Sequence, residues 1–252
     1  MSEHPESAGI FLSVVVPAYN EEARIGQTLR SIASYLRKQR FRSEVIVVDD
    51  GSRDRTVEEA ERALRGMSDV RIIRCPRNAG KGSAVKEGVL RAQGDFVLFS
   101  DADLSTPIEE IEKFWPRIEQ GCDVVIGSRA LPGSDIRVRQ SLVRELMGKA
   151  FNVFVGLLAV KGIPDTQCGF KMFKREAARE IFPLVETKGF SFDVEALCLC
   201  GRRGLRIGQV PVVWRNSPRS RVKIVASSAG MLAELWKISR RHRADATKRK
   251  TS

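Results

Sequence analysis

The sequence predicts an α/β protein with a mostly parallel sheet and helices on both faces. Short runs rich in β-branched residues alternate with longer amphipathic segments through the first half of the chain. Most of these runs are followed by Asp, Asn, Pro or Gly, which are typical of turns. The chain has 252 residues, 42% of them hydrophobic, which suits one large domain. This strand–helix alternation favours a parallel sheet.

Each element is expected from its local pattern. The expected strands cover residues 12–16, 44–48, 70–74, 95–99 and 123–126, and the expected helices cover residues 21–38, 56–65, 83–92 and 107–118. Pro17 would end the first strand, and Asn20 would cap the first helix. Gly66 would end the second helix, and Pro107 suits a first helical turn.

Two acidic clusters follow strands that would be close in such a sheet. Asp49 and Asp50 begin an Asp-Asp-Gly-Ser turn, and Asp101 and Asp103 form an Asp-Ala-Asp motif. Ligands bind beyond the carboxyl ends of parallel strands, so both clusters should face one crevice. Asp101 and Asp103 could share Mg²⁺ or Mn²⁺ near a substrate phosphate, or they could be solvated turn residues. Asp49 and Asp50 could accept hydrogen bonds from a nucleoside, or simply mark a turn.

Three other features of the sequence bear on its chemistry. The loop at 78–82 contains Gly80 and Lys81 but matches neither a Walker A loop nor a Gly-x-Gly-x-x-Gly motif. It could bring its backbone close to a nucleotide, or be a surface turn. Asp193 lies among apolar residues and could act as a base toward a hydroxyl, or cap a helix. Both histidines are in terminal segments and no nucleophile elbow occurs, which disfavours histidine-based catalysis.

The formal net charge of +12 is concentrated in three stretches. Residues 237–250 hold seven Lys or Arg against one Asp, residues 215–223 hold four against none, and residues 137–149 hold four against one Glu. Such patches predict a polyanion, and an anionic membrane surface or a phosphorylated ligand fits better than nucleic acid. A solvated tail is the alternative for the last stretch. Residues 142–160 form an amphipathic pattern that suits a membrane surface or a core helix equally.

The compartment is expected to be the cytoplasm. The first nine residues lack the basic start and apolar core of a signal peptide. The five cysteines are scattered and include no Cys-x-x-Cys pair. The uncharged stretch from Ala150 to Val160 is much shorter than the roughly 18 residues of a spanning helix. Any membrane attachment should therefore be peripheral, on the cytoplasmic face.

Together the motifs resemble those of family 2 glycosyltransferases. The resemblance rests on Val-Val-Val-Pro-Ala-Tyr-Asn-Glu at 14–21, Asp-Asp-Gly-Ser at 49–52 and Asp-Ala-Asp at 101–103, and it covers roughly residues 10–223. It implies a GT-A fold and inverting transfer of a sugar from a nucleotide donor. The motifs at 101–107, 127–129 and 165–171 look like the dolichyl-phosphate β-glucosyltransferase branch. That branch implies UDP-glucose as donor and a polyprenyl phosphate as acceptor.

The resemblance also assigns roles to residues. The donor would contact Pro17, Tyr19, Glu21, Asp49, Asp50 and Asp101. Gly80 and Lys81 are further candidates for substrate binding, from the glycine and basic content of their loop. Asp101 and Asp103 would hold the metal, Arg129 would face the phosphates, and Arg215, Ser220 and Arg221 would belong to a clamping loop. Gln167, in the motif at 165–171, is a further candidate for substrate binding. On charge grounds, Arg137, Arg139 and Arg144 could hold the acceptor phosphate. Asp103, Asp193 and Arg215 are thus the candidate catalytic residues.

The resemblance further implies a division of the chain. Residues 1–9 would be a tail, 10–130 a nucleotide-sugar half, 131–223 an acceptor half, and 224–252 an amphipathic helix with a basic end. Two related activities are alternatives: a polyprenyl-phosphate mannose synthase, and a family 2 enzyme with a saccharide hydroxyl acceptor. A basic nucleotide- or membrane-binding protein without catalysis is the alternative from another class.

Overall fold

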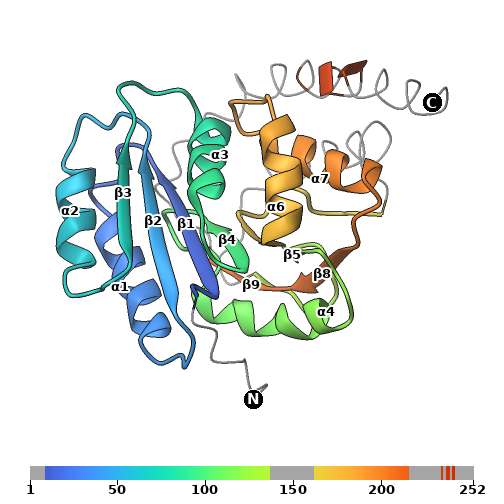
Figure 1. Ribbon diagram of the computed structural model, residues 1–252, viewed down its shortest axis with the longest axis horizontal. Coiled ribbons are helices and arrows are strands. Elements are labelled where there is room, and N and C mark those ends of the chain that lie inside the picture. The colour runs from blue at the N-terminus through green and yellow to red at the C-terminus, as the bar shows by residue number, and fades with distance from the viewer. Residues whose placement is uncertain (1–8, 137–161, 216–233, 235–236, 239, 242–252) are drawn as a thin grey trace.

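A seven-stranded mixed sheet forms the centre of the protein (Figure 1). The computed structural model describes residues 9–136, 162–215, 234, 237–238 and 240–241. The strands are β1 (Leu12–Ala18), β2 (Ser43–Asp49), β3 (Val70–Arg74), β4 (Phe96–Ser100), β5 (Val124–Ser128), β7 (Phe170–Lys174) and β8 (Ile207–Pro211). Their order is β3-β2-β1-β4-β7-β5-β8, and only β7 runs against its neighbours. The predicted α/β class is confirmed.

Helices cover both faces of this sheet. They are α1 (Ile25–Leu36), α2 (Thr56–Ala63), α3 (Lys81–Arg91), α4 (Trp115–Glu119), α6 (Arg175–Ile181) and α7 (Phe192–Arg202), with 3₁₀ turns η1 (Ile108–Lys113) and η2 (Phe182–Leu184). A short two-stranded sheet pairs β6 (Asp135–Ile136) with β9 (Val213–Trp214).

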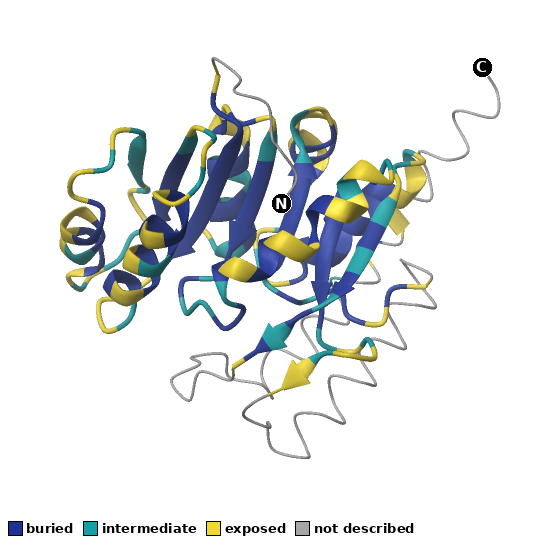
Figure 2. Ribbon diagram, turned by 90° about the horizontal axis from the view of Figure 1, so that it is seen from below, coloured by how far each residue is buried: buried dark blue, intermediate teal, exposed yellow. Residues whose placement is uncertain are grey.

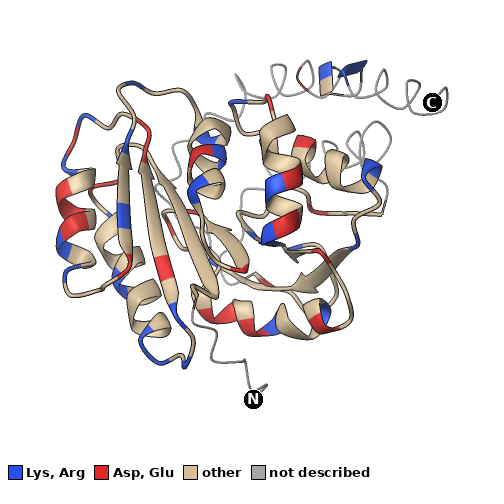
Figure 3. Ribbon diagram, in the orientation of Figure 1, with Lys and Arg blue, Asp and Glu red and all other residues tan. Residues whose placement is uncertain are grey.

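Alternating strand residues supply two hydrophobic cores. Val14 and Val16 pack with α1, η1 and α4 on one face, and Val15 packs with α3, α6 and α7 on the other. Both faces of the inner strands are therefore buried, as their dark colour in Figure 2 shows. Such double burial explains why β1 and β2 read as continuous apolar runs. In Figure 3 the strands are mostly tan, whereas charged residues lie on outer helices such as α2 and α6.

The first strand and first helix differ from expectation. β1 continues through Pro17, which pairs in register with Val48. Since β4 pairs only with Leu12–Val15, Pro17 has a strand on one side only, where a missing N–H is tolerated. Asn20 has a φ of 54° and does not cap α1, which begins at Ile25 after Arg24. The prediction of a cap at Asn20 was wrong because its polar groups bond to another loop.

The expected helix at 107–118 is also divided. It consists of η1 and the short α4, which meet at Phe114. Pro116 has no N–H to donate to the preceding turn, so one α-helix cannot run through it.

The described part of the second half adds the antiparallel strand β7. It lies between β4 and β5, and its start at Phe170 pairs with Ser100 at the end of β4. Residues just before β7 therefore lie at the same edge as the carboxyl ends of β1, β2, β4 and β5.

The predicted helix at 142–160 lies outside the described residues, as do Arg137, Arg139, Arg144, Ser220 and Arg221. Within the described ranges, none of the helices has the length and apolar character needed to cross a membrane.

Candidate active site

The loop after β1 is bonded to the loop after β2. Asn20 donates its N–H to Ser52 Oγ at 2.8 Å, and its side-chain carbonyl accepts the N–H of Arg53 at 2.8 Å. Glu21 donates its N–H to Thr56 Oγ1 at 2.7 Å. These bonds hold Asn20 in its left-handed conformation and place Tyr19 and Glu21 at the sheet edge.

Asp50 fixes the glycine-containing loop. Its carboxylate accepts the N–H groups of Ala79 and Gly80, each at 2.8 Å. Asp50 is only 3% exposed, so these bonds satisfy a buried charge with backbone donors. Asp49 accepts the N–H of Ser52, which forms the turn after β2. Gly51, at φ +74°, has no room for a side chain against the backbone of Arg77.

Lys81 joins this loop to the second acidic cluster. Its Nζ lies 2.6 Å from Asp101 Oδ1. Since the N–H of Gly80 is bonded to Asp50, the neighbours Gly80 and Lys81 connect the acidic ends of β2 and β4. The structure thus brings together the two clusters that the sequence placed at one edge.

The surroundings of Lys81 are charged and aromatic. Burial opposes its charge, but the carboxylates of Asp101 and Asp193 together raise the pKa of Lys81 above its ordinary value. The rings of Phe190 and Phe192 have their centroids 5.9 and 5.8 Å from its Nζ. The ammonium is therefore held in place as a fixed positive charge at the site.

Asp101 is confined by the segment before β7. Its N–H donates to Gly169 O at 3.1 Å. A Cβ added to Gly169 would lie 2.0 Å from Asp101 Oδ2, so the carboxylate rests directly against the glycine. Only glycine allows this approach.

Asp103 has a cation as its neighbour as well. Arg24 Nη1 lies 3.6 Å from Asp103 Oδ2, and the same guanidinium forms an ion pair with Glu21. Asp103 Oδ1 accepts the N–H of Ser105 at 3.0 Å. The intervening Leu104 has a φ of 45°, which is unusual for a branched residue and marks local strain at this loop.

Two carboxylates are available here for a divalent cation. Asp101 Oδ1 is buried and, among the described residues, accepts no aligned hydrogen bond even though Lys81 is close. The described ranges contain no group of three or more His, Cys, Asp or Glu side chains suited to a metal. Mg²⁺ is commonly bound by one or two carboxylates together with substrate phosphates and water. Asp101 and Asp103 fit that kind of site.

A second charged unit lies after β5. Asp165 accepts three hydrogen bonds from Arg129: from its N–H at 2.8 Å, from Nε at 2.7 Å and from Nη2 at 2.8 Å. Burial opposes the shift, but the attraction of Arg129 lowers the pKa of Asp165. The guanidinium also stacks 5.4 Å from the Trp214 ring centroid. Arg129 is therefore rigidly held at the sheet edge where the sequence predicts substrate.

Asp193 is the second residue of α7 and lies in the interior. It is 3% exposed, and its Oδ1 accepts a hydrogen bond from Lys171 Nζ at 2.7 Å. Burial raises the pKa of Asp193, although the ammonium groups of Lys171 and Lys81 oppose the shift. This carboxylate is neither a helix cap nor a solvated group.

Glu195, also in the first turn of α7, holds the segment before this helix in place. Its Oε2 accepts the N–H groups of Glu186 and Thr187 at 3.0 and 2.7 Å, and its Oε1 accepts from Arg241 at 3.0 Å. The carbonyls of Thr187 and Lys188 in turn lie against the glycine loop, where Gly82 donates its N–H to Lys188 O at 2.7 Å.

Other candidates from the sequence lie around the same edge. Arg215 is exposed and donates its N–H to Ser105 O at 2.8 Å, which places it beside the Asp101–Asp103 loop. Gln167 follows Asp165, whose Oδ1 accepts its N–H at 3.2 Å. Pro17 is buried in β1, and Tyr19 is 39% exposed.

Four residues at this edge were not selected from the sequence: Arg24, Asp165, Gly169 and Lys171. Arg24 stood in an expected helix, where a surface arginine is ordinary. The other three belong to the motif at 165–171, which carries the family resemblance but does not indicate a role for them. Asp165 contacts a residue 36 positions away, Gly169 one 68 positions away and Lys171 one 22 positions away. No local sequence pattern indicates contacts over such separations.

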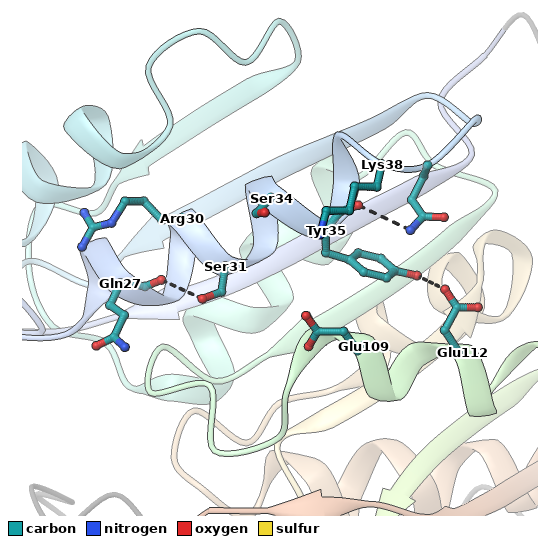
Figure 4. A pocket seen from close by; sticks show the side chains of 9 residues that line it. Gln27, Arg30, Ser31, Ser34, Tyr35, Lys38, Glu109 and Glu112 are labelled. Carbon is teal, nitrogen blue, oxygen red and sulfur yellow. Dashed lines mark hydrogen bonds between the residues drawn. The ribbon is translucent and has the colours of Figure 1, made fainter.

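One hollow on the described surface lies away from both acidic clusters. A pocket of about 580 Å³ runs between α1 and η1. Figure 4 shows its polar lining, in which Tyr35 donates to Glu112 Oε1 at 2.6 Å. The residues that line it are Gln27, Arg30, Ser31, Ser34, Tyr35, Lys38, Gln39, Glu109 and Glu112. Neither acidic cluster contributes a residue to this pocket. The candidate site is therefore placed at the charged residues of the strand ends and not at the pocket.

Comparison with known proteins gives a consistent result. The model of the family described as Glycosyl transferase family 2 matches residues 13–182. Dolichyl-phosphate beta-glucosyltransferase of Dictyostelium discoideum is 37% identical over 245 residues, covering 92% of this chain and 75% of the relative. The human protein of the same description is 37% identical over 227 residues, covering 84% and 69%. The crystal structure of Mycobacterium tuberculosis glucosyl-3-phosphoglycerate synthase with UDP superposes with a TM-score of 0.68 at 25% identity, covering 92% and 81%.

Proposed function

Because the chain belongs to glycosyl transferase family 2 and has the GT-A fold, we propose that this glycosyltransferase moves glucose from UDP-glucose to a polyprenyl phosphate such as dolichyl phosphate. The curated relatives described above are named for that acceptor and that sugar. The observation that supports the donor site most directly is the connection of Asp50 and Asp101 through Gly80 and Lys81.

The donor would lie along the edge formed by the loops after β1, β2 and β4. Tyr19, Glu21 and Asp49 would contact the nucleoside, and the loop held by Asp50 would lie beside it. Lys81 and Arg24 provide positive charge beside the two aspartates, where a diphosphate would otherwise be repelled. Arg215, bonded to Ser105 through its backbone, would close over the donor from the other side.

Asp101 and Asp103 would hold Mg²⁺ or Mn²⁺. When bound, the ion supplies charge that neutralises the departing diphosphate. Fixed groups aimed at developing charge are effective because they need no reorganisation during the reaction. The loop at 101–105, whose N–H groups at Asp101, Leu104 and Ser105 are hydrogen-bonded and whose Leu104 has a positive φ, provides such fixed geometry.

The acceptor phosphate needs little help from a base. It is already ionised near neutral pH, so one of its oxygens can attack the anomeric carbon while the bond to the diphosphate breaks. Attack from the face opposite the diphosphate inverts the configuration. The remaining task is positioning, which can lower a barrier substantially. Arg129 would orient the phosphate, with Gln167 nearby, because its guanidinium is fixed by Asp165 and Trp214.

Attachment to an anionic membrane surface, on the cytoplasmic face, is part of the proposal. A polyprenyl acceptor is confined to a bilayer, and the chain concentrates its net positive charge in three basic stretches. Arg137, Arg139 and Arg144 precede the amphipathic pattern at 142–160 and would approach lipid headgroups. Ser220 and Arg221 belong to the basic stretch proposed as the clamping loop.

The test is product analysis with purified protein. UDP-glucose, Mg²⁺ or Mn²⁺ and a polyprenyl phosphate in vesicles should yield UDP and a glucosylated lipid, and EDTA should abolish the yield. Parallel reactions with a mannose donor, and with a saccharide in place of the lipid, examine the two related activities. Donor binding without a lipid product would overturn the acceptor assignment, and UDP binding without any turnover would indicate a binding protein.

A hydroxyl acceptor would require a base, for which Asp193 is the candidate. Its burial and its bond to Lys171 Nζ weigh against that role, because a base must reach the proton that it removes. The lipid phosphate is therefore the acceptor that the site fits better.

A further inference from the structure

Lys171 is a buried cation that the proposed reaction does not use. It lies on β7, its side chain is 1% exposed, and it ranks among the largest fully buried side chains of the described residues. Burying an ammonium group is costly unless opposite charge and acceptors surround it. The groups that surround the Lys171 ammonium should therefore explain why a lysine is buried in this sheet.

Its partners belong to three different elements. Lys171 Nζ donates to Asp193 Oδ1 at 2.7 Å, at the start of α7. It also donates to Cys168 O at 2.5 Å, in the segment before β7, and lies 5.2 Å from the ring centroid of Phe99 on β4. One ammonium group therefore joins α7, the 165–169 segment and β4.

The first of these links leads to Asp101. The carbonyl of Cys168 lies one residue before Gly169, whose carbonyl accepts the Asp101 N–H and whose Cα supports the Asp101 carboxylate. A shift of this backbone would therefore move Asp101 directly.

The second link leads to Lys81. Lys81 Nζ lies 2.6 Å from Asp101 Oδ1 and faces the rings of Phe190 and Phe192, at and just before the start of α7. Phe192, which precedes Asp193, has its ring 5.8 Å from Lys81 Nζ and its Cβ where a side chain on Gly82 would be. The start of α7 therefore determines where Lys81 and its loop can lie.

We propose that Lys171 is a positioning residue for the donor site. Its pairing with Asp193 and Cys168 O sets the relative placement of Asp101 and Lys81, which contact the nucleotide diphosphate. Asp193 then serves as a counter-ion between two lysines instead of a base. This inference depends on the proposed function only for the identity of the donor.

The test compares Lys171→Met with Lys174→Met. Lys174 lies on the same strand, but its ammonium pairs with Asp123 at 3.2 Å, at the opposite edge of the sheet, and its side chain is 31% exposed. We expect Lys171→Met to weaken UDP binding at least tenfold in the presence of Mg²⁺, measured by calorimetry. Lys174→Met should stay within twofold of the unaltered protein.

A double variant separates positioning from folding. Lys171→Met leaves Asp193 buried without its partner and could unfold the protein, whereas Lys171→Met with Asp193→Asn removes both charges. We expect the double variant to unfold cooperatively and still to bind UDP at least tenfold more weakly. Its KM for the donor should rise while its KM for the lipid phosphate stays unchanged. Unaltered UDP affinity in the folded double variant, or an equal rise in both KM values, would overturn the inference.

The outcomes for the two proposals differ. If the unaltered protein binds UDP but makes no glucosylated lipid, the proposed function fails, and the UDP affinities still decide the role of Lys171. If glucosylated lipid is made equally well by the folded double variant, only the inference about Lys171 fails. If the unaltered protein does not bind UDP, both are wrong.

Discussion

The two acidic clusters at the sheet edge are satisfied in different ways. After β2, the buried carboxylate of Asp50 accepts two backbone N–H groups. After β4, Asp101 and Asp103 face the side chains of Lys81 and Arg24. The same residue type therefore shapes a loop in one place and forms a charged surface in the other. Both clusters follow a strand, so position alone does not distinguish their roles. The groups that each carboxylate contacts do distinguish them.

The largest effect is expected from Asp103→Asn. The amide keeps the size of the side chain but removes a charge that would hold the metal, so the rate of glucosyl transfer should fall by about 10²-fold or more. The measurement is glucosylated lipid formed per minute at saturating donor. Asp95→Asn is the matched control, because Asp95 pairs with Arg175 at the other edge. Near-normal transfer by Asp103→Asn would refute the metal role.

The next effect is expected from Gly169→Ala. The new Cβ would lie 2.0 Å from Asp101 Oδ2, so the carboxylate must move and transfer should fall by about tenfold or more. Gly201→Ala is the control, because no described atom lies within 4 Å of its Cβ and alanine suits a helix. Equal activity of the two variants would show that the position of Asp101 is unimportant.

A smaller effect is expected from Asp50→Asn, which probes the other cluster. The amide can accept only one of the two N–H groups of Ala79 and Gly80, and the lost bond is worth about 1 kcal/mol. UDP should bind about fivefold more weakly by calorimetry. Asp69→Asn, at the far edge beside Arg42, should bind UDP normally. A change in turnover without a change in UDP affinity would contradict a purely loop-holding role.

Asp165→Asn is expected to change the rate of transfer least among these variants, but to lower the free energy of unfolding clearly. Because the folded pKa of Asp165 is lowered, the unfolded chain takes up a proton first as the pH falls. The stabilisation is complete above the ordinary Asp pKa of about 3.9 and is lost as the pH falls through the folded value. Urea unfolding of the protein and of Asp165→Asn should differ by about 3 kcal/mol at neutral pH.

The difference in unfolding free energy should shrink in acid, since Asp165 is then protonated and neutral, as the asparagine of the variant is at every pH. A difference that is independent of pH would show that lost packing, not charge, destabilises the variant.

Local patterns predicted the first half of the fold well. The strand at 70–74 is found at the expected residues, and β2 and β5 differ by one or two residues at their ends. β2 and β5 are buried on both faces, so apolar runs bounded by turn residues identify them, whereas β3 at the sheet edge is only partly buried. The first helix was less predictable, because Asn20 bonds across to Ser52 and Arg53, which lie more than 30 residues away.

The sequence predicted the acids of the site and its cations Lys81, Arg129 and Arg215, but not which groups these cations contact. Asp101 and Asp103 stand out as a close pair after a strand, and Asp50 stands out beside Gly51. Lys81 was selected as part of a loop, but its contact with Asp101 follows from the packing of Gly80 and Gly82 against residues 187–189.

The sequence by itself determined which strands are buried, where the acids follow them and where positive charge accumulates, because these depend on neighbouring residues. Only the tertiary structure decided that β7 enters the sheet antiparallel between β4 and β5. That insertion places Asp165 against Arg129, Gly169 against Asp101 and Lys171 against Asp193. The physical reason is that each of these contacts joins charges or backbone across long chain separations, which local propensities do not encode.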